Sequence, residues 1–455
     1  MAGVTINFEK QIGNIKPMNG VNSGPKTKVF TYDATELFKE ANIPYSRLHD
    51  VEYPYGSGEF VDIHCVFPNF DADVNDPSSY NFGLTDAYIK ATIESGAKVI
   101  YRLGESIEHA PVKRYIYAPK DYRKWARICE HIILHYNAGW ADGHHFDITY
   151  WEIWNEPDGD TDKRPEQSHT TWIGNREEFY DFYEVTAKYL KETFPHLKIG
   201  GPALAHRVDW TADFVAEMAK RNVPLDFYSW HIYCAQIDKI VARSEAIYEI
   251  LQQNGYTDTE MILDEWNYME SWNHQPRSFR KLVTATGAAF CGAALIALQS
   301  TVNTIGAYFE ADVIKEWCGI FRVKNMAICK ASEHKDGCVL EPRKPFYAFK
   351  AFGKLLELGA QVESHCEDDG IYVCAAKNVK EQAVMMVSYQ SNISQGITEV
   401  TLKGLPKEGC QIEVYLTDEA YDEKLEKTIL CQEEMFVLPL NLVDEQVRLI
   451  KIQTK

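Results

Sequence analysis

Two glutamates stand at the ends of short, aromatic-rich segments of the sequence. Glu156 ends the segment ITYWEIWNE and is followed by Pro157, and Glu265 lies in MILDEWN. Burial raises a carboxyl pKa and neighbouring donors lower it, so two carboxyl groups in contrasting surroundings can hold opposite protonation states near neutral pH. One group then protonates a leaving oxygen while the other attacks carbon or activates water, as the cleavage of a glycosidic bond requires.

The segments that position these residues alternate between strand-like and helical patterns. The helical period is clearest in residues 121–136, where Trp125, Ile128 and Ile132 share one face behind Asp121, which can cap the first turn. A second helical segment, residues 177–194, stops at Pro195. The strand-like runs between the helical segments are residues 18–24, 43–50, 97–104, 148–156, 197–204, 226–233, 261–267 and 304–310.

These runs make eight β-then-α units, which predict the α/β class and a closed (β/α)8 TIM barrel. An open doubly wound sheet is the alternative. It is disfavoured because no GxGxxG motif follows the first strand, and because polar residues end nearly every strand instead of gathering at one switch point.

After about residue 356 the pattern changes to short alternating runs such as QAVMMVSYQ and QIEVYLTDE, separated by turn residues. This pattern predicts an accessory β-sandwich. The opening VTINFEK has the same alternation, and we expect it to pair into that sandwich. We therefore predict a catalytic barrel from residues 18–356 and a β-sandwich domain from residues 1–17 and 357–455.

All strands of a parallel barrel deliver their last residues to the same mouth. Glu156 at the end of the fourth strand and Glu265 at the end of the seventh are therefore predicted to face each other. Alternation puts Glu156 in phase with Trp154, and Glu265 in phase with Leu263 and Met261, so each acid is expected above apolar layers.

The composition excludes several classes of partner. The 66 acidic residues outnumber the 47 lysines and arginines, for a formal net charge of -19, so we expect no nucleic acid and no anionic lipid surface as a partner. No apolar run is long enough to span a bilayer, and the start MAGVTINFEK lacks a signal-peptide pattern. We expect a cytoplasmic protein, although a trimmed signal leaves no trace.

The 11 scattered cysteines are typical of reduced buried thiols.

The motifs IWNEPD and LDEWN, in this order, resemble the two catalytic strand ends of clan A glycoside hydrolases. The motif SRLHD with Arg47 and His49, the motif SWHIY with His231 and Tyr233, and KPFYAF at 344–349 are similar to those of glycoside hydrolase family 39, which holds β-xylosidases and α-L-iduronidases. The resemblance covers the order of the whole barrel and the sandwich. The family's second strand usually ends in an RFHG-like motif, and the departure here bears on the shape of the sugar subsites.

The resemblance implies that Glu156 is the general acid/base, that Glu265 is the nucleophile and that Asn155 hydrogen-bonds the sugar 2-hydroxyl. It also implies substrate binding by His49. The residue types add that Arg47 and Tyr233 can donate to an ionised carboxylate and hold it in the attacking orientation.

The sequence also gives expectations for other aromatic and histidine residues near the mouth of the barrel. His231 offers a polar contact beside the acids. At the eighth strand end, either Tyr308 or Phe309 is expected to stack on the sugar, and the sequence does not choose between them. His144 and His145 precede the fourth strand in a predicted loop, and we expect them to be solvated and not to be metal ligands.

Together these observations predict a retaining, exo-acting glycoside hydrolase that takes a small glycoside or oligosaccharide and uses no metal or cofactor. A pentose, xylose or arabinose, is the first candidate, by resemblance. Exo action is expected because the aromatic loop 51–82 can wall off one end of the cleft. The alternatives are a carbohydrate-binding pseudo-enzyme and a transglycosidase with the same two glutamates. Members of the family that the sequence resembles often assemble, so a homo-oligomer is a further expectation.

Overall fold

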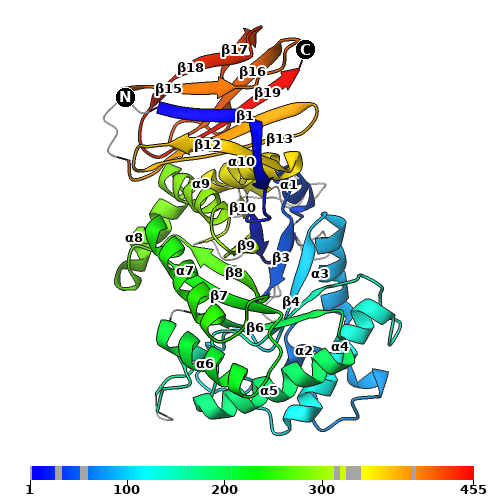
Figure 1. The fold of residues 1–455 in the computed structure, drawn as a ribbon. Helices are drawn as coiled ribbons and strands as arrows, with labels where there is room; N and C mark the ends of the chain where they lie inside the picture. The colour runs from blue at the N-terminus through cyan, green and yellow to red at the C-terminus, as the bar shows by residue number, and fades with distance from the viewer. Residues whose placement is uncertain are drawn as a thin grey trace.

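The computed structural model describes residues 3–25, 33–51, 60–164, 167–205, 207–311, 318–323, 340–391 and 396–454. Eight parallel strands form a closed barrel in the order of the chain, so the predicted barrel is confirmed, strand by strand (Figure 1). The barrel strands are β2 (Gly20–Asn22), β3 (Tyr45–Leu48), β4 (Lys98–Leu103), β5 (Tyr150–Ile153), β6 (Lys198–Leu204), β7 (Phe227–Tyr233), β8 (Glu260–Asn267) and β9 (Ile305–Tyr308).

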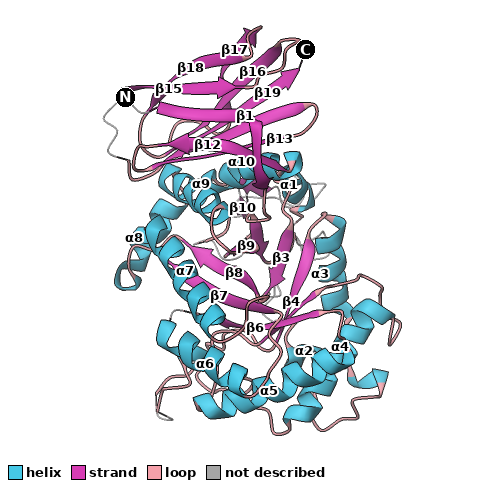
Figure 2. Ribbon diagram, in the orientation of Figure 1, coloured by secondary structure: helices cyan, strands magenta, loops and turns pink. Residues whose placement is uncertain are grey.

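Helices cover the outside of the barrel (Figure 2). They are α1 (Thr35–Glu40), α2 (Ile63–Val66), α3 (Gly83–Glu94), α4 (Tyr122–Ala138), α5 (Arg176–Thr193), α6 (Val208–Lys220), α7 (Ile237–Gln253), α8 (Gln275–Leu282), α9 (Ala285–Gln299) and α10 (Lys344–Leu358), with short 3-10 helices at Pro77–Ser79, Pro157–Gly159 and Trp272–His274. The helix predicted from residue 121 is α4, and the Asp121 side chain accepts a hydrogen bond from the Lys124 amide, as expected for its cap.

Both ends of the chain contribute strands to a second sheet. Its strands are β1 (Gly3–Asn14), β12 (Ala360–Cys366), β13 (Ile371–Lys377), β14 (Glu381–Ser388), β15 (Gly396–Lys403), β16 (Cys410–Thr417), β17 (Lys424–Cys431), β18 (Met435–Leu442) and β19 (Gln446–Thr454). The opening strand β1 pairs antiparallel with β12 and parallel with β15.

All nine strands belong to one hydrogen-bonded sheet, in the order β17-β16-β19-β14-β13-β12-β1-β15-β18. Leu402 and Leu440, near one end of this order, share an apolar core with Ile412 and Ile452, near the other end. The sheet therefore curls into the two layers of a sandwich. Helices α9 and α10 lie between this sandwich and the barrel and contact β13, β14 and β19 (Figure 1).

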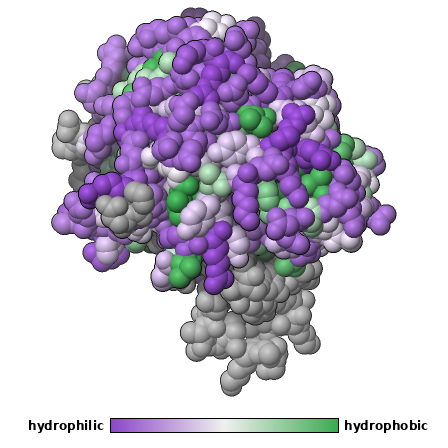
Figure 3. Space-filling view, turned by 90° about the horizontal axis from the view of Figure 1, so that it is seen from below, coloured by the Kyte–Doolittle hydropathy of each residue, from purple (hydrophilic) through white to green (hydrophobic). Residues whose placement is uncertain are grey.

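The face of the barrel opposite the sandwich is mostly hydrophilic, with hydrophobic residues only in small separate spots (Figure 3). Among the described residues, no single helix is long and apolar enough to cross a membrane; the segments Trp272–Leu282 and Ala285–Gln299 meet that criterion only as a pair bent by 97°.

A short stretch of the aromatic loop 51–82 falls outside the described residues, at positions 52–59. The rest of the loop is anchored to its neighbours. The amide of Ile63 donates to the carbonyl of Gly104 over 3.0 Å, and the Tyr80 ring packs edge-on against Trp140 with centroids 5.0 Å apart. This part of the loop is thus fixed beside the ends of β4 and α4.

Candidate active site

Glu156 is held in a strained turn just beyond the end of β5. Trp154 and Glu156 both have left-handed backbone conformations, with φ of 73° and 49°, and Pro157 opens the 3-10 helix that follows. The amide of Glu156 donates to the carbonyl of Ala203 over 2.9 Å, which fixes the turn against β6. Non-glycine residues in this conformation are concentrated at functional sites, where the surrounding structure enforces them.

Glu265 reaches the barrel interior because strand β8 contains a bulge. Trp230 of β7 is paired with Leu263 and His231 is paired with Glu265, so Asp264 is the extra residue. The predicted alternation is therefore wrong at this point. Leu263 packs in the outer core beneath the helices, while Ile262 lies in the apolar layer inside the barrel.

The two glutamates meet at the mouth, as the strand-end argument predicts. Carboxylate oxygens of Glu156 and Glu265 and a ring nitrogen of His231 all lie within 4.8 Å of one another. His231 Nδ1 lies 2.8 Å from Glu156 Oε1 and 3.7 Å from Glu265 Oε2. The Tyr233 hydroxyl donates to Glu265 Oε1 over 2.5 Å. Both acids are largely buried, so their interactions with these partners are only weakly screened by solvent.

Arg47 organises the floor of the site. Its Nη1 donates to Glu265 Oε2 over 3.1 Å and its Nη2 donates to Asn155 Oδ1 over 2.7 Å. Its Nε donates to Glu152 Oε2 over 2.7 Å and lies 3.0 Å from Asp264 Oδ2. Arg47, Glu152 and Asp264 are fully buried, so the acids stand above a charged layer and not directly above the predicted apolar layers.

The environment separates the acids by protonation state. Burial raises the pKa of Glu156 to about 7, an effect that the hydrogen bond from His231 opposes and the charge of Glu265 reinforces. Burial likewise raises the pKa of Glu152 to about 8, against the pull of Arg47. Asp264 is the opposite case, because the Arg47 charge and further hydrogen bonds outweigh burial and hold its pKa at about 2.

His231 carries positive charge at this site. Burial alone lowers its pKa, but the negative charges of Glu265 and Asp264 outweigh burial and hold that pKa well above the ordinary value. Two cations, Arg47 and His231, therefore lie among the carboxyl groups of Glu152, Glu156, Asp264 and Glu265.

A cavity of about 860 Å³ opens above the two glutamates. Tyr233, Phe309 and Trp272 line one part of it, and Trp272 is 54% exposed with its ring centroid 5.3 Å from that of Tyr233. Polar side chains line another part: Asp50, His109, Asp160, Lys163, Thr170 and Thr171. The space suits a ligand with both apolar faces and polar groups.

Five of the seven predicted substrate-binding residues do not line this cavity: Arg47, Asn155 and His231, which belong to the buried network around the two glutamates, and Tyr308 and His49. Tyr308 is buried, donates to the carbonyl of Cys318 over 3.0 Å and packs edge-on against Trp266. Of the two candidate stacking residues, Phe309 alone reaches the cavity. His49 is also fully buried, with its Nε2 3.2 Å from the Asp50 carboxylate, so its contact with the cavity is indirect, through Asp50.

Three residues of the site were not found from the sequence. Asp264 was not predicted because the expected phase put Glu265 inward and Asp264 outward; Asp264 is in fact in phase with the inward Ile262, and the bulge adds Glu265 to the same face. Asn22, whose Oδ1 accepts from Arg47 Nη1 over 3.2 Å, lies in a short first strand with no distinguishing motif. Trp272 opens the three-residue 3-10 helix after β8, which is too short for a periodicity to give its direction.

A closed parallel barrel with two glutamates at the ends of its fourth and seventh strands is the arrangement of a glycoside hydrolase. The family model of Glycosyl hydrolases family 39 matches residues 13–318, and the chain belongs to this family. The predicted resemblance is thereby confirmed.

Individual relatives agree with this assignment. A β-xylosidase of Geobacillus stearothermophilus is 34% identical over 122 residues, 26% of this chain and 22% of that protein. A β-xylosidase of Caldicellulosiruptor saccharolyticus is 26% identical over 249 residues, 50% of this chain and 46% of that protein. The chain thus spans less than half the length of either. The crystal structure of a glucosidase from Croceicoccus marinus has the same fold, with a TM-score of 0.79 at 20% identity over 100% of this chain and 99% of that one.

Proposed function

We propose that this protein is a retaining, exo-acting glycosidase that removes a terminal sugar from a small glycoside or oligosaccharide. The observation that carries the proposal is the close approach of Glu156 and Glu265, whose nearest carboxylate oxygens lie within 4.8 Å. Retaining enzymes keep their carboxyl groups about 5–5.5 Å apart, whereas inverting enzymes need about 6.5–9.5 Å to admit a water molecule between acid and sugar.

In the first step Glu265 attacks the anomeric carbon while Glu156 protonates the leaving oxygen. The roles follow from the surroundings. Glu265 accepts hydrogen bonds from Arg47 and Tyr233, which favour its ionised form and hold its oxygens in place. Glu156 has a pKa raised to about 7 by burial, so about half of the molecules hold this proton at pH 7 and most of them hold it at pH 6. In the second step Glu156 takes a proton from water while the water oxygen attacks the anomeric carbon, and the bond between the sugar and Glu265 breaks.

Asn155 is placed to bind a sugar hydroxyl. Its Oδ1 accepts from Arg47 Nη2, which fixes the orientation of the amide group. Its Nδ2 is buried and has no hydrogen-bond partner among the described residues. A buried donor without a partner costs stability, and a hydroxyl of the bound sugar supplies that partner.

Xylose or arabinose is the first candidate for the released sugar, because the two curated relatives are named β-xylosidases. Exo action rests on the expectation that the loop 51–82 closes one end of the cleft. Asp50, directly before this loop, lines the cavity, which supports that placement. Internal cleavage of a polymer into mixed oligosaccharides contradicts exo action.

The test is turnover of nitrophenyl glycosides, both anomers of xylose, arabinose, glucose, galactose, fucose and uronic acids. Glu265→Ala is the blank, and Glu249→Ala, an exposed glutamate on α7, is the matched control. We expect one glycoside to be hydrolysed by the wild type and the control, with the first-formed sugar retaining its anomeric configuration by NMR.

Azide added to Glu265→Ala should give the glycosyl azide of opposite configuration, since a small anion replaces the missing nucleophile. Inverted sugar from the wild type refutes the retaining mechanism. Binding of sugars without turnover of any glycoside indicates the pseudo-enzyme, and transfer to added sugar in preference to water indicates the transglycosidase.

A further inference from the structure

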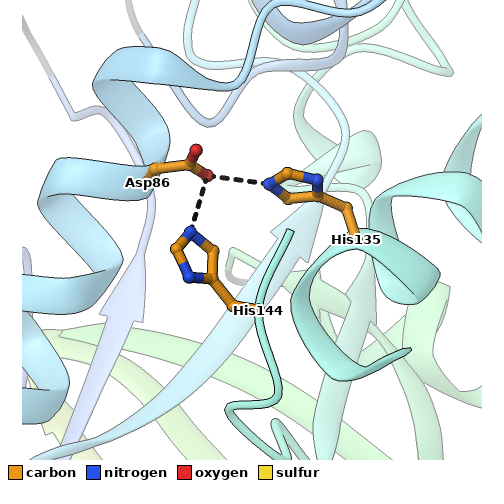
Figure 4. Close-up of side chains that lie close together, drawn as sticks. All are labelled: Asp86, His135 and His144. Carbon is orange, nitrogen blue, oxygen red and sulfur yellow. Dashed lines mark hydrogen bonds and ion pairs between the residues drawn. The ribbon is translucent and has the colours of Figure 1, made fainter. Parts of the chain in front are cut away.

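A second cluster of ligating side chains lies in the helical layer of the barrel (Figure 4). Asp86 belongs to α3, His135 belongs to α4, and His144 lies in the segment between α4 and β5. One carboxylate oxygen and one ring nitrogen from each histidine lie within 4.8 Å of one another. None of these residues lines the cavity above Glu156 and Glu265.

The hydrogen bonds of His135 fix which of its nitrogens carries a proton. Its Nδ1 lies 2.8 Å from the carbonyl oxygen of Trp140, which only accepts, so Nδ1 carries the hydrogen. In the neutral imidazole Nε2 then presents a lone pair, and it lies 3.0 Å from Asp86 Oδ1. A lone pair facing a carboxylate oxygen is repulsive unless a cation or a proton lies between them. Histidines that bind metals show this same bond from the second nitrogen to a carbonyl.

His144 adds a second nitrogen aimed at the same oxygen. Its Nε2 lies 3.6 Å from Asp86 Oδ1, beyond hydrogen-bond range, and is buried without a hydrogen-bond partner among the described residues. Ligands about 2.0–2.1 Å from a tetrahedral metal ion lie about 3.3 Å from each other, by the geometry of the tetrahedron. The distances of 3.0 and 3.6 Å from Asp86 Oδ1 to the two nitrogens lie on either side of that value.

The two imidazole rings are fixed before any ion binds. His135 stacks on Phe82 with centroids 3.5 Å apart and planes 3° apart, and His144 stacks on Phe146 at 4.4 Å and 8°. The backbone amide of His144 donates to the carbonyl of His135 over 2.6 Å. A Cβ at Gly143 would come within 2.2 Å of that carbonyl oxygen, so this close packing of the loop on the helix requires glycine.

We propose that Asp86, His135 and His144 form a binding site for a divalent transition-metal ion. Two imidazole nitrogens and one carboxylate oxygen suit Zn²⁺, with a fourth position left for water. The ion joins α3, α4 and the loop before β5, so it acts on stability and not on the glycosidic reaction. The expectation that both loop histidines are solvated thus fits the exposed His145 alone.

Two other clusters among the described residues bring three such atoms together, but their groups are already engaged. In one, Asp62 pairs with Arg102 and accepts from Ser106, and His64 contacts both Cys65 and Glu105. The other is the catalytic cluster of Glu156, His231 and Glu265.

The test uses the full chain after treatment with a chelator. Isothermal titration with Zn²⁺ at pH 7 and metal analysis after gel filtration should give one ion per chain, and the melting temperature should rise with added Zn²⁺, because an ion that binds only the folded state stabilises it. His144→Asn and Asp86→Asn should each weaken binding at least tenfold. His145→Asn, on the same loop, is the matched control and should bind as the wild type does.

Co²⁺ titrated into the wild type supplies a readout that does not depend on the folding of any variant, since tetrahedral Co²⁺ has distinct visible absorption bands. Absence of Zn²⁺ and Co²⁺ binding to the wild type overturns the proposal. So does binding that survives in His144→Asn and Asp86→Asn but disappears in Glu265→Ala, which places the ion at the catalytic cluster.

Discussion

The proton on Glu156 should govern the alkaline side of the pH profile. Burial raises the pKa of this carboxyl to about 7. The protonated fraction then falls from roughly 90% at pH 6 to roughly 10% at pH 8, by the titration of a single group. If Glu156 is the general acid, kcat/KM of the wild type falls about fivefold from pH 7 to pH 8 and about tenfold for each further pH unit.

The substitution Glu156→Gln removes the proton donor and keeps the shape of the side chain and an oxygen beside His231. General acid catalysis contributes about 10²–10⁴ in rate, so glycosides with poor leaving groups should lose activity by that factor. A glycosyl fluoride, whose leaving group needs little protonation, should keep its rate of glycosylation. The assay is kcat/KM from pH 5 to 9 with both substrates. An alkaline limb that persists in the variant, or equal losses for the two substrates, refutes the role of Glu156.

The ionisation of Glu156 also affects the stability of the fold, and the direction of the change with pH follows from its raised pKa. The pKa of Glu156 is about 7 in the fold and 4.5 without the environment of the fold. The folded state binds more protons between these values, so stability falls as the pH rises from 4.5 to 7. The difference of 2.5 units corresponds to about 3 kcal/mol above pH 7. Glu156→Gln should therefore raise the melting temperature at pH 8 and change it little at pH 4.5, compared with the control Glu249→Gln. A variant that melts below the wild type at pH 8 contradicts this account of burial.

Two further substitutions test the rest of the site. Tyr233→Phe removes a hydrogen bond to a charged group, worth about 1.5–3 kcal/mol, so kcat should fall about 10- to 150-fold with little change in melting temperature; a loss below threefold shows that Tyr233 does not position Glu265. Trp272→Ala removes an exposed ring beside Tyr233, and contacts of aromatic faces are worth about 0.5–1.5 kcal/mol. It should raise KM about 2- to 12-fold for a disaccharide and leave kcat for a glycosyl fluoride unchanged, and equal effects on both substrates would exclude a role in binding the leaving group.

The barrel was predictable because its strands are buried apolar runs separated by helices of clear period. The strands of the sandwich were harder to predict from the sequence. β12 (Ala360–Cys366) buries only Val362, and β17 (Lys424–Cys431) lies at the edge of the sheet with nearly all of its residues exposed. Neither strand shows the alternation that a half-buried strand requires, because neither covers much of the core, and neither was found from the sequence.

Some features of the candidate site could likewise be predicted from the sequence, and others could not. That Glu156 and Glu265 lie at the same mouth follows from barrel topology, since all strand ends face one mouth. The inward position of Asp264 and Glu265 together does not, because the bulge in β8 that puts both on the inner face is set by pairing with β7 and leaves no mark in the local sequence. The exclusion of Tyr308 from the cavity depends likewise on its packing against Trp266 and Phe349.

The buried charges beneath the mouth explain how one carboxyl group can serve both steps of the proposed reaction. The charge of Glu265 is one of the causes that raise the pKa of Glu156. When Glu265 becomes an ester with the sugar, that charge disappears, while Arg47 and His231 keep their positive charges. The pKa of Glu156 must then fall, so the group that donated a proton in the first step loses its proton readily and accepts one from water in the second. The cations that hold the nucleophile in place thus also convert the acid into a base.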